Sequence, residues 1–240
     1  MTAPRFFYPF SPQCGDTIEL PDTLAHHAVR VLRLKHDTPI VLFDGRQGQY
    51  HATLILEGKK ALAHIHKYET RNVELAGHLT LGQALVSSDK MDWIIEKAVE
   101  TGVRTFIPVL ARRSVVNLGA ERIGKKMRHW EKIIESACAQ CGRNQVMQLT
   151  EPKTLPSLLA TTDLTLICHP DAPHSLRDVL NPSSNHITLL IGPEGGWSEE
   201  EMAQADKAGV KPVRFGKRIL RTETAGLAMV SAISALQDWE

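Results

Sequence analysis

Residues Ile187–Ala225 read ITLLIGPEGGWSEEEMAQADKAGVKPVRFGKRILRTETA, and the rest of the chain is best understood from them. The apolar run Ile187–Ile191 has the length of a buried strand. Glycines follow it, and they permit a tight turn and a close approach of backbone to a ligand. Ser198 and Glu201 match a capping box, so a helix should begin there, and Gly209 suits its end.

The second half of this stretch predicts another loop, Gly216–Thr222, before a last helix. This loop carries three cations: Lys217, Arg218 and Arg221. Loops that follow parallel strands meet at one edge of a sheet, where α/β proteins bind their ligands. The two loops together therefore predict a ligand site. The first loop lacks the Gly-Lys-Ser/Thr ending of a P-loop, which argues against hydrolysis of a nucleoside triphosphate.

Outside these loops, strands and helices alternate from about residue 73 onward. The predicted strands are His78–Val86, Thr105–Leu110 and Leu164–Cys168, and the predicted helices include one that starts at Ser88 or Asp89 and another over Glu121–Gln140. This alternation predicts an α/β domain whose parallel sheet is covered on both faces. We place the domain at 73–240, because the hydrophobic period changes within Arg71–Gly77.

Residues 1–72 have the pattern of a small β-rich domain. A helix capped by Asp22 is expected to run to about Lys35. Strands are expected over Pro39–Phe43, Gln49–Leu56 and Ala61–Tyr68. Asp-Gly and Glu-Gly pairs supply the turns between the strands. Strand-rich barrels of this size are a common format for RNA binding.

Composition sets the broad class of protein. The 240 residues carry a net charge of +1, so the overall charge does not indicate nucleic-acid binding. Hydrophobic residues make up 42% of the chain. No apolar run reaches the roughly 20 residues that span a bilayer. The N-terminus lacks the apolar core of a signal peptide, and four cysteines form no disulfide framework. We therefore expect a cytoplasmic protein.

The motifs GPEGG and GKRILRTETA, about twenty residues apart, resemble those of the RsmE-type methyltransferases of the SPOUT superfamily. MDWIIEKAVETGV at Met91–Val103, QCGRN at Gln140–Asn144, and the N-terminal RFF and HAVRVLRLK segments extend the resemblance over nearly the whole chain. Two departures are Ala139, where an acidic residue is usual, and Phe215, where leucine is usual.

The resemblance implies both a fold and a function. The fold would be a C-terminal SPOUT domain with an α/β trefoil knot, preceded by a PUA-like RNA-binding barrel. The function would be methylation of N3 of a uridine in 16S ribosomal RNA, with S-adenosylmethionine as cofactor. The partners would be 16S RNA or the small ribosomal subunit and a second copy of the chain, with neither DNA nor a membrane. Alternatives are a SPOUT enzyme that methylates the ribose 2′-hydroxyl and a non-catalytic module for RNA binding or ribosome assembly.

The resemblance also implies a cofactor pocket between the loops. Glycines and short aliphatic residues there would offer apolar faces and backbone groups to an adenine ring. The expected cofactor-binding residues are His169, Ile191, Gly192, Gly195, Gly196, Ile219, Leu220 and Thr222.

Methyl transfer from a sulfonium needs no metal, but a uridine N3 must lose its proton before it can accept the methyl group. The resulting charge spreads onto O2 and O4, so cations aimed at these oxygens would favour the anion. Arg218 and Arg221 are the candidates for this role, and each could instead contact a phosphate. Glu194 is a candidate base. It could instead accept backbone hydrogen bonds or pair with an arginine.

RNA contacts outside the pocket are expected from Arg5, Arg30, Arg33, Arg112 and Arg113, with a plain solvated role as the equal alternative for each of the first three. Arg112 and Arg113 open a run, Ala111–Lys132, with seven cations and two anions. Such a run can contact phosphates, or it can be a solvated helix face. The pair Cys138 and Cys141, and the histidine pairs, lack the partners of a metal site, so no metal is expected.

Overall fold

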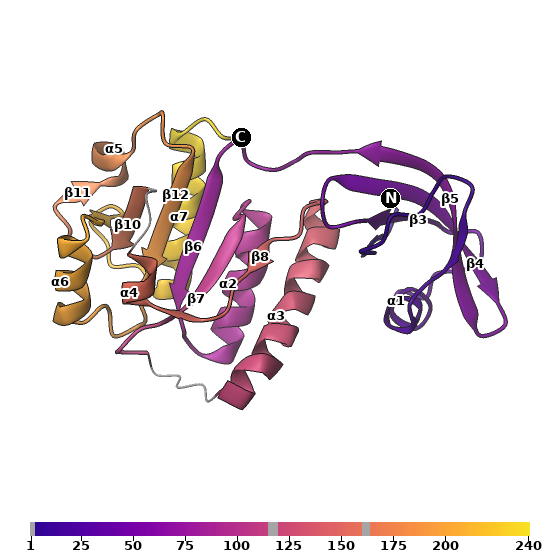
Figure 1. Ribbon diagram of the computed structural model, residues 1–240, viewed down its shortest axis with the longest axis horizontal. Coiled ribbons are helices and arrows are strands. Elements are labelled where there is room, and N and C mark those ends of the chain that lie inside the picture. The colour runs from indigo at the N-terminus through magenta and orange to yellow at the C-terminus, as the bar shows by residue number, and fades with distance from the viewer. Residues whose placement is uncertain (1–2, 115–119, 160–163) are drawn as a thin grey trace. The chain divides into compact units, whose positions relative to one another are not determined.

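The computed structural model describes residues 3–114, 120–159 and 164–240 (Figure 1). The chain divides into two compact units. The first runs to Glu74 and also includes Cys138–Val146, and the second comprises Leu75–Ala137 and Met147–Glu240. The long helix α3, Ala120–Cys141, therefore crosses the division.

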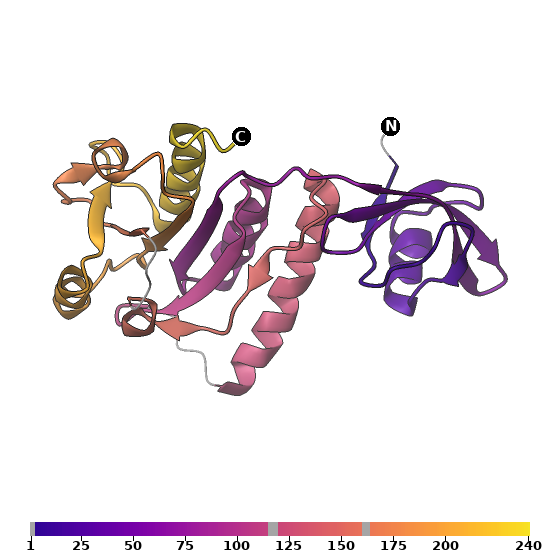
Figure 2. The ribbon, with the colours of Figure 1, turned by 45° about the horizontal axis from the view of Figure 1, so that its top comes forward.

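The first unit is a five-stranded sheet in the order β1-β3-β4-β5-β2. Its elements are β1 (Arg5–Phe7), β2 (Thr17–Glu19), α1 (Asp22–His26), the π-helical turn η1 (His27–Val31), β3 (Pro39–Phe43), β4 (Gly48–Glu57) and β5 (Lys60–Thr70). Strand β1 pairs with β3 in parallel, and the remaining pairs are antiparallel. Figure 2 shows α1 lying against these strands. Leu24 and Ala28 of the helical segment join Leu54 and Ile65 in one buried core.

The helical segment of this unit is shorter than predicted. It ends at Val31 rather than near Lys35, and its second half has π-helical geometry. Pro21 occupies the cap position, so Asp22 is the first helical residue and not the cap. Arg33 then takes a positive φ of 53°, which ends the helical path. No glycine or proline between Pro21 and Pro39 signals this ending in the sequence.

Nine residues from the C-terminal side of α3 complete the first unit. Asn144 Nδ2 donates to the backbone oxygens of Gln47 and Arg71, at 3.1 and 3.3 Å. Arg143 forms an ion pair with Glu74, and the two side chains are only 4% and 3% exposed. Buried charges are tolerated when they are paired in this way. The segment Cys138–Val146 is therefore bound into the first unit by polar contacts as well as by packing.

The second unit is built on a parallel sheet in the order β11-β13-β10-β12-β6-β7-β8, with β9 beside β7. Its strands are β6 (His78–Ala84), β7 (Thr105–Leu110), β8 (Gln148–Leu149), β9 (Lys153–Thr154), β10 (Leu164–Cys168), β11 (His174–Ser175), β12 (His186–Ile191) and β13 (Lys211–Arg214). Its helices, apart from α3, are α2 (Ser88–Glu100), α4 (Leu155–Leu158), α5 (Leu176–Val179), α6 (Glu199–Lys207) and α7 (Thr222–Leu236).

The strand pairs described in this sheet are all parallel, which confirms the predicted α/β class. Strand β12, the apolar run of the opening motif, lies between β10 and β6 near the middle of the sheet. Its residues Ile187–Ile191 are buried, as a strand covered on both faces requires. Figure 1 shows α7 and α2 together behind β12, β6 and β7, and these two helices contact each other.

The predicted capping box of α6 is confirmed. Ser198 Oγ accepts from the Glu201 N–H at 3.2 Å, and Glu201 Oε2 accepts from the Ser198 N–H at 2.8 Å. Glu201 Oε1 also accepts from the Arg112 N–H, which ties the start of α6 to the chain after β7. Gly209 has a φ of +76° at the helix end. Along the described part of the chain, every helix is too short or too polar to cross a membrane.

Candidate functional site

A pocket of about 630 Å³ lies at the carboxyl ends of the central strands of the second unit. Its walls come from the segments after β10, after β12 and before α7, together with Arg113 after β7. Successive parallel strands present their carboxyl ends at one sheet edge, so segments far apart in sequence converge there. The volume lies within the range of small-molecule sites, which is about 300–1,000 Å³.

The structure brings together all the residues predicted to bind a cofactor. The pocket is lined by His169, Ile191, Gly192, Gly195, Gly196, Ile219, Leu220 and Thr222. Cys168, at the end of β10, also lines it, as do Trp197 and Arg113, which were not expected there. The glycine turn, Gly192–Gly196, and the basic loop, Gly216–Thr222, thus both contribute residues to one cavity rather than forming two separate sites.

Two glycines of the turn are required for different reasons. A Cβ on Gly192 would lie 3.1 Å from Trp197 Nε1, so a larger residue would press on the indole ring. A Cβ on Gly196 would meet nothing within 4 Å, but the φ of this residue is +67°. That left-handed conformation is costly for residues other than glycine. Substitution of Gly196 would therefore act through backbone strain, whereas substitution of Gly192 would act through a collision.

The pocket wall contains a buried donor without a partner. Trp197 is buried, and its Nε1–H has no hydrogen-bond partner among the described residues. Buried polar groups are normally paired, so each unpaired one calls for an explanation. A ligand that brings an acceptor into the pocket would supply the missing bond.

A buried glutamine links the two loops. Gln83, near the end of β6, donates through Nε2 to Thr222 Oγ1 at 3.0 Å, and Thr222 Oγ1 donates to the Gly192 backbone oxygen at 2.6 Å. Gln83 is fully buried, and its Oε1 has no partner among the residues described. The chain of bonds fixes the glycine turn against the start of α7. Strand β6 also contains His78 and Thr80, so its sequence did not single out Gln83, which was not among the predicted site residues.

Glu194 is held by a lysine from another element. Lys90 Nζ on α2 lies 2.9 Å from Glu194 Oε1 and 3.4 Å from Glu223 Oε2. Burial acts to raise the pKa of Glu194, but hydrogen bonds from Lys90 and from its own backbone, with the charges of Lys90 and Arg221, lower it overall. Glu194 is thus an ionised carboxylate at neutral pH. Its partner is a lysine, whereas an arginine was one of the alternatives expected.

The two candidate arginines occupy neighbouring hollows. Arg221 lines the main pocket, and Arg218 lines a smaller hollow of about 60 Å³ that shares His169, Ile219 and Leu220 with it. Both arginine side chains are exposed, so their charged ends can reach a second ligand beside the pocket. Ile219, between them in sequence, is 85% exposed.

Thiol chemistry does not suit this pocket. Burial raises the pKa of Cys168 to about 11, so the thiol keeps its proton at neutral pH. A thiol is a poor nucleophile compared with a thiolate. Cys138, elsewhere, donates to the Gln145 backbone oxygen at 3.6 Å, a packing role. Within the described ranges, no group of three or more His, Cys, Asp or Glu side chains is placed to hold a metal ion.

The arginines predicted to contact RNA fall into two groups. Arg30 and Arg33 are exposed on and after η1, as an RNA contact requires. Arg5 is instead engaged inside the first unit: it donates to Gln49 Oε1 at 2.8 Å and to Asn144 Oδ1 at 2.6 Å. These bonds give Arg5 a structural role, which the sequence pattern did not indicate.

Arg112 and Arg113 also have internal partners. Arg112 forms an ion pair with Glu200. Arg113 donates through Nη1 to the backbone oxygens of Gly195 and Trp197, at 3.2 and 3.3 Å. Arg113 therefore supports the glycine turn of the pocket. The contact with the glycine turn accounts for the orientation of the Arg113 side chain, which membership in the basic run Ala111–Lys132 does not.

Comparisons with known proteins agree with this architecture. An RNA methyltransferase domain model matches residues 73–234, and an RNA methyltransferase PUA domain model matches residues 20–63. The ribosomal RNA small subunit methyltransferase E of Buchnera aphidicola subsp. Acyrthosiphon pisum is 30% identical over 90% of this chain and 87% of its own. That of Bacillus subtilis is 30% identical over 87% and 86%.

Two solved structures extend the match to the whole fold. The ribosomal RNA small subunit methyltransferase E of Neisseria gonorrhoeae, bound to S-adenosyl methionine, superposes with a TM-score of 0.90 at 37% identity. A Legionella pneumophila structure described as a methyltransferase with bound SAM gives 0.94 at 32%. Each comparison covers 98% of both chains. The chain therefore belongs to the family of ribosomal RNA small subunit methyltransferase E.

Proposed function

We propose that the chain transfers a methyl group from S-adenosylmethionine to N3 of a uridine in 16S ribosomal RNA, in the cytoplasm. The observation that carries this proposal is the convergence of the glycine turn and the basic loop on one pocket. An apolar cavity beside exposed cations suits a cofactor next to an anionic substrate. The relative from Neisseria gonorrhoeae was solved with S-adenosyl methionine, which supports the same cofactor here.

The residues present fit that cofactor. Ile191 and Leu220 offer apolar surface to an adenine ring, and the glycines let backbone groups approach it. The unpaired Trp197 Nε1–H marks a place where an acceptor is needed. When bound, S-adenosylmethionine supplies a methyl group on a sulfonium, which is a good leaving group. The Gln83–Thr222–Gly192 bonds would hold both walls at a fixed separation.

The arginines are assigned to the substrate. A uridine that loses its N3 proton carries negative charge on O2 and O4, and a preorganised cation stabilises that charge where it develops. Arg221 lines the pocket itself and Arg218 lies beside it, so both can face a base next to the methyl donor. Glu194 is less suited to removing the proton, because a carboxylate with a lowered pKa is a weaker base. We assign it to holding Lys90 and Arg221 in place.

The test is methylation of 16S RNA in a strain that lacks the gene. Mass spectrometry of digested RNA should show loss of one N3-methyluridine, which the wild-type gene restores. Arg221→Ala should restore little of it while the purified protein still binds S-adenosylmethionine. Lys217→Ala is the matched control, since Lys217 is an exposed cation of the same loop that lines neither hollow. A methyl group on ribose, or full restoration by Arg221→Ala, would contradict the proposal.

We further propose that the active form is a homodimer. Helix α7 buries one face, with Met229, Val230 and Ile233 in the core. Its other face carries small residues that are exposed or half-buried: Thr224, Ala228, Ser231 and Ala235. Small residues permit close approach of a second helix, and the exposed Ile219 lies just before the same helix. A two-fold contact on this surface would bring the pocket of one copy next to the other copy.

A further inference from the structure

The first unit has a hollow of its own. Its volume is about 550 Å³, comparable with small-ligand sites. It lies beside the turn between β3 and β4, where the paired strands β4 and β5 present Tyr50 and Tyr68. The residues that line it are Ser11, Asp44, Arg46, Gln47, Gly48, Tyr50, Tyr68, Thr70 and Gln145. We call it the tyrosine pocket.

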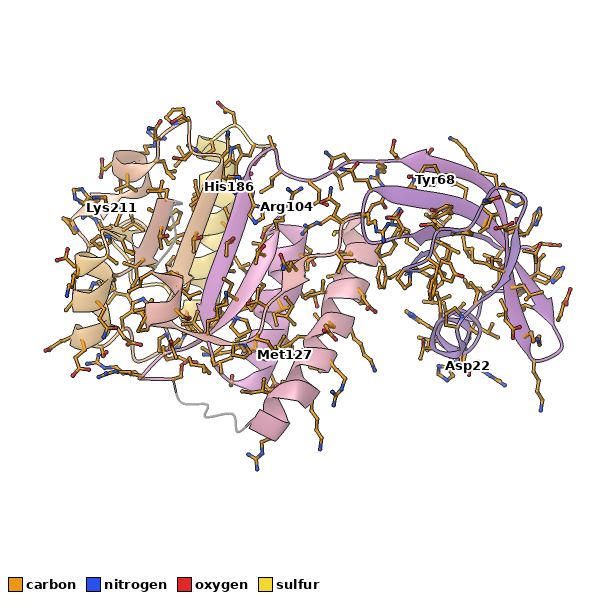
Figure 3. The ribbon with its side chains drawn as sticks, viewed as in Figure 1. Asp22, Tyr68, Arg104, Met127, His186 and Lys211 are labelled. Carbon is orange, nitrogen blue, oxygen red and sulfur yellow. The ribbon has the colours of Figure 1, made fainter. Side chains whose placement is uncertain are left out.

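The pocket offers an aromatic surface to solvent. Tyr68, on β5 and labelled in Figure 3, is 45% exposed, which is high for so large a ring in a sheet. Its ring is braced by Tyr50, which is buried, with 5.0 Å between the ring centroids. A Cβ on Gly48 would come within 2.6 Å of the Tyr68 ring. The absence of a side chain at Gly48 therefore lets Tyr68 lie over the turn.

The polar groups of the pocket are suited to a neutral ligand with hydrogen-bond donors. Asp44 Oδ1 accepts from the backbone N–H groups of Arg46 and Gly48, at 2.8 and 3.1 Å. Both bonds use the same oxygen, so Oδ2 keeps its lone pairs for a donor. Arg46 is the only cation and Asp44 the only anion among the lining residues. This balance gives a phosphate no advantage over an uncharged group.

We propose that the tyrosine pocket binds one unpaired nucleobase that carries an exocyclic amino group. The inference rests on the proposed function, because it takes RNA as the substrate. Proteins read RNA mainly at unpaired bases, which stack on aromatic side chains. Tyr68 supplies the stacking face, and the Asp44 carboxylate accepts from the amino group, as carboxylates do from cytosine N4. The site would select a base in the RNA that is not the methylated uridine.

The test uses the full chain and two single-stranded RNA 12-mers, oligo(C) and oligo(U), at one fixed low salt concentration. The two pyrimidines have the same size. At position 4 cytosine has an amino donor where uracil has a carbonyl acceptor, and at N3 the roles are reversed. Fluorescence anisotropy should show tighter binding of oligo(C). Tyr68→Ala should weaken its binding about tenfold, as loss of one stacked base does. Phe10→Ala is the matched control, since Phe10 is 59% exposed in the same unit and does not line the pocket.

Asp44→Asn separates base reading from general affinity. Asparagine keeps an oxygen for the two backbone N–H groups and replaces the other oxygen with an amino group, which is a donor. The preference for oligo(C) should therefore disappear or reverse toward oligo(U). Equal binding of both oligomers by the wild type, equal losses in Tyr68→Ala and Phe10→Ala, or no measurable binding would each overturn the proposal. Methylation is measured on the same proteins. If the protein methylates RNA but does not prefer oligo(C), only the tyrosine-pocket proposal is refuted. If it prefers oligo(C) but does not methylate RNA, only the proposed function is refuted.

Discussion

Gly196 allows the cofactor assignment to be tested at a single residue. Its φ of +67° is strained for a β-branched residue, although there is open space around it. Gly196→Val should distort the turn that forms the pocket wall. We expect the affinity for S-adenosylmethionine, measured by calorimetry, to fall at least about tenfold, since the strain is about 1–2 kcal/mol and displaces ligand-facing backbone.

Gly209→Val is the control for that experiment. Gly209 also has a positive φ, +76°, and open space, but it lies at the end of α6 and does not line the pocket. Gly209→Val should lower the melting temperature about as much as Gly196→Val does, and it should leave cofactor affinity unchanged. Equal affinity of Gly196→Val and Gly209→Val for S-adenosylmethionine would show that the glycine turn is not part of the cofactor site.

Gln83 lies outside both loops of the pocket, but its substitution should still weaken cofactor binding. Gln83→Met keeps the volume but removes the donor to Thr222, so the start of α7 is no longer fixed to β6. We expect the KM for S-adenosylmethionine to rise about five- to tenfold, in line with loss of a buried hydrogen bond of about 1–1.5 kcal/mol. Gln49→Met removes a buried glutamine of the first unit and should leave that KM unchanged. A reduced kcat at constant KM would show that Gln83 affects turnover and not cofactor binding.

Single residues were predictable where their signal is local. The capping box of Ser198 and Glu201 involves residues three apart, so sequence alone was enough to find it. The bond from Gln83 to Thr222 spans 139 positions, and no local pattern predicts it. Arg5 has partners that a local pattern does not reveal either. Its charge suggested RNA, but its partners Gln49 and Asn144 are supplied by distant parts of the chain.

At the scale of elements, buried apolar runs gave the most accurate predictions. The strands Pro39–Phe43, Thr105–Leu110 and Leu164–Cys168 begin and end where they were expected. Such runs are bounded by turn residues on both sides, which marks their ends. The helix after Pro21 was predicted too long because η1 changes geometry without a glycine or proline to signal it.

Glu69, on the surface of β5, should make the stability of the first unit sensitive to acid. Hydrogen bonds from Lys67, His51 and Gln49 hold the pKa of Glu69 at about 2, below its usual value of 4.5. The folded state thus favours the carboxylate, and this stabilisation is complete above about pH 4.5 and is lost as the pH falls toward 2. In Glu69→Gln the contribution is absent at every pH.

Hydrogen exchange of peptides from β4 and β5, measured by mass spectrometry, checks this. The wild type should exchange more slowly than Glu69→Gln at pH 6, and the difference should shrink as the pH is lowered to 3. A difference that stays constant over this range would show that the Glu69 contacts do not depend on its charge.

At the scale of the whole molecule, the proposed dimer can be separated from the fold. Ala228 is half-buried on the uncovered side of α7, so Ala228→Glu should leave the monomer folded and disrupt a contact between copies. Analytical ultracentrifugation should show a dimer for the wild type and a monomer for this variant, with methylation lost. Ile233 lies in the core and is unsuitable, because Ile233→Glu would bury a charge and unfold the chain.

Gln204→Glu on α6 is the control, since it adds a carboxylate at an exposed position outside α7. It should sediment and methylate as the wild type does. A wild-type monomer at micromolar concentration with normal turnover would refute the dimer. The resemblance implied a second copy of the chain, but only the structure shows which side of α7 the monomer already covers.

The membership of Cys138–Val146 in the first unit constrains how this architecture can be inherited. A gene segment that ends before residue 75 lacks Asn144 and Arg143. Its product would leave Glu74 without its ion-pair partner, and Arg5 would lose Asn144 while keeping Gln49. The first unit is therefore not a separable N-terminal segment, and recombination near residue 75 would transfer an incomplete unit. Substitutions at Arg5 and Asn144 should covary between species, although 138 intervening positions separate the two residues.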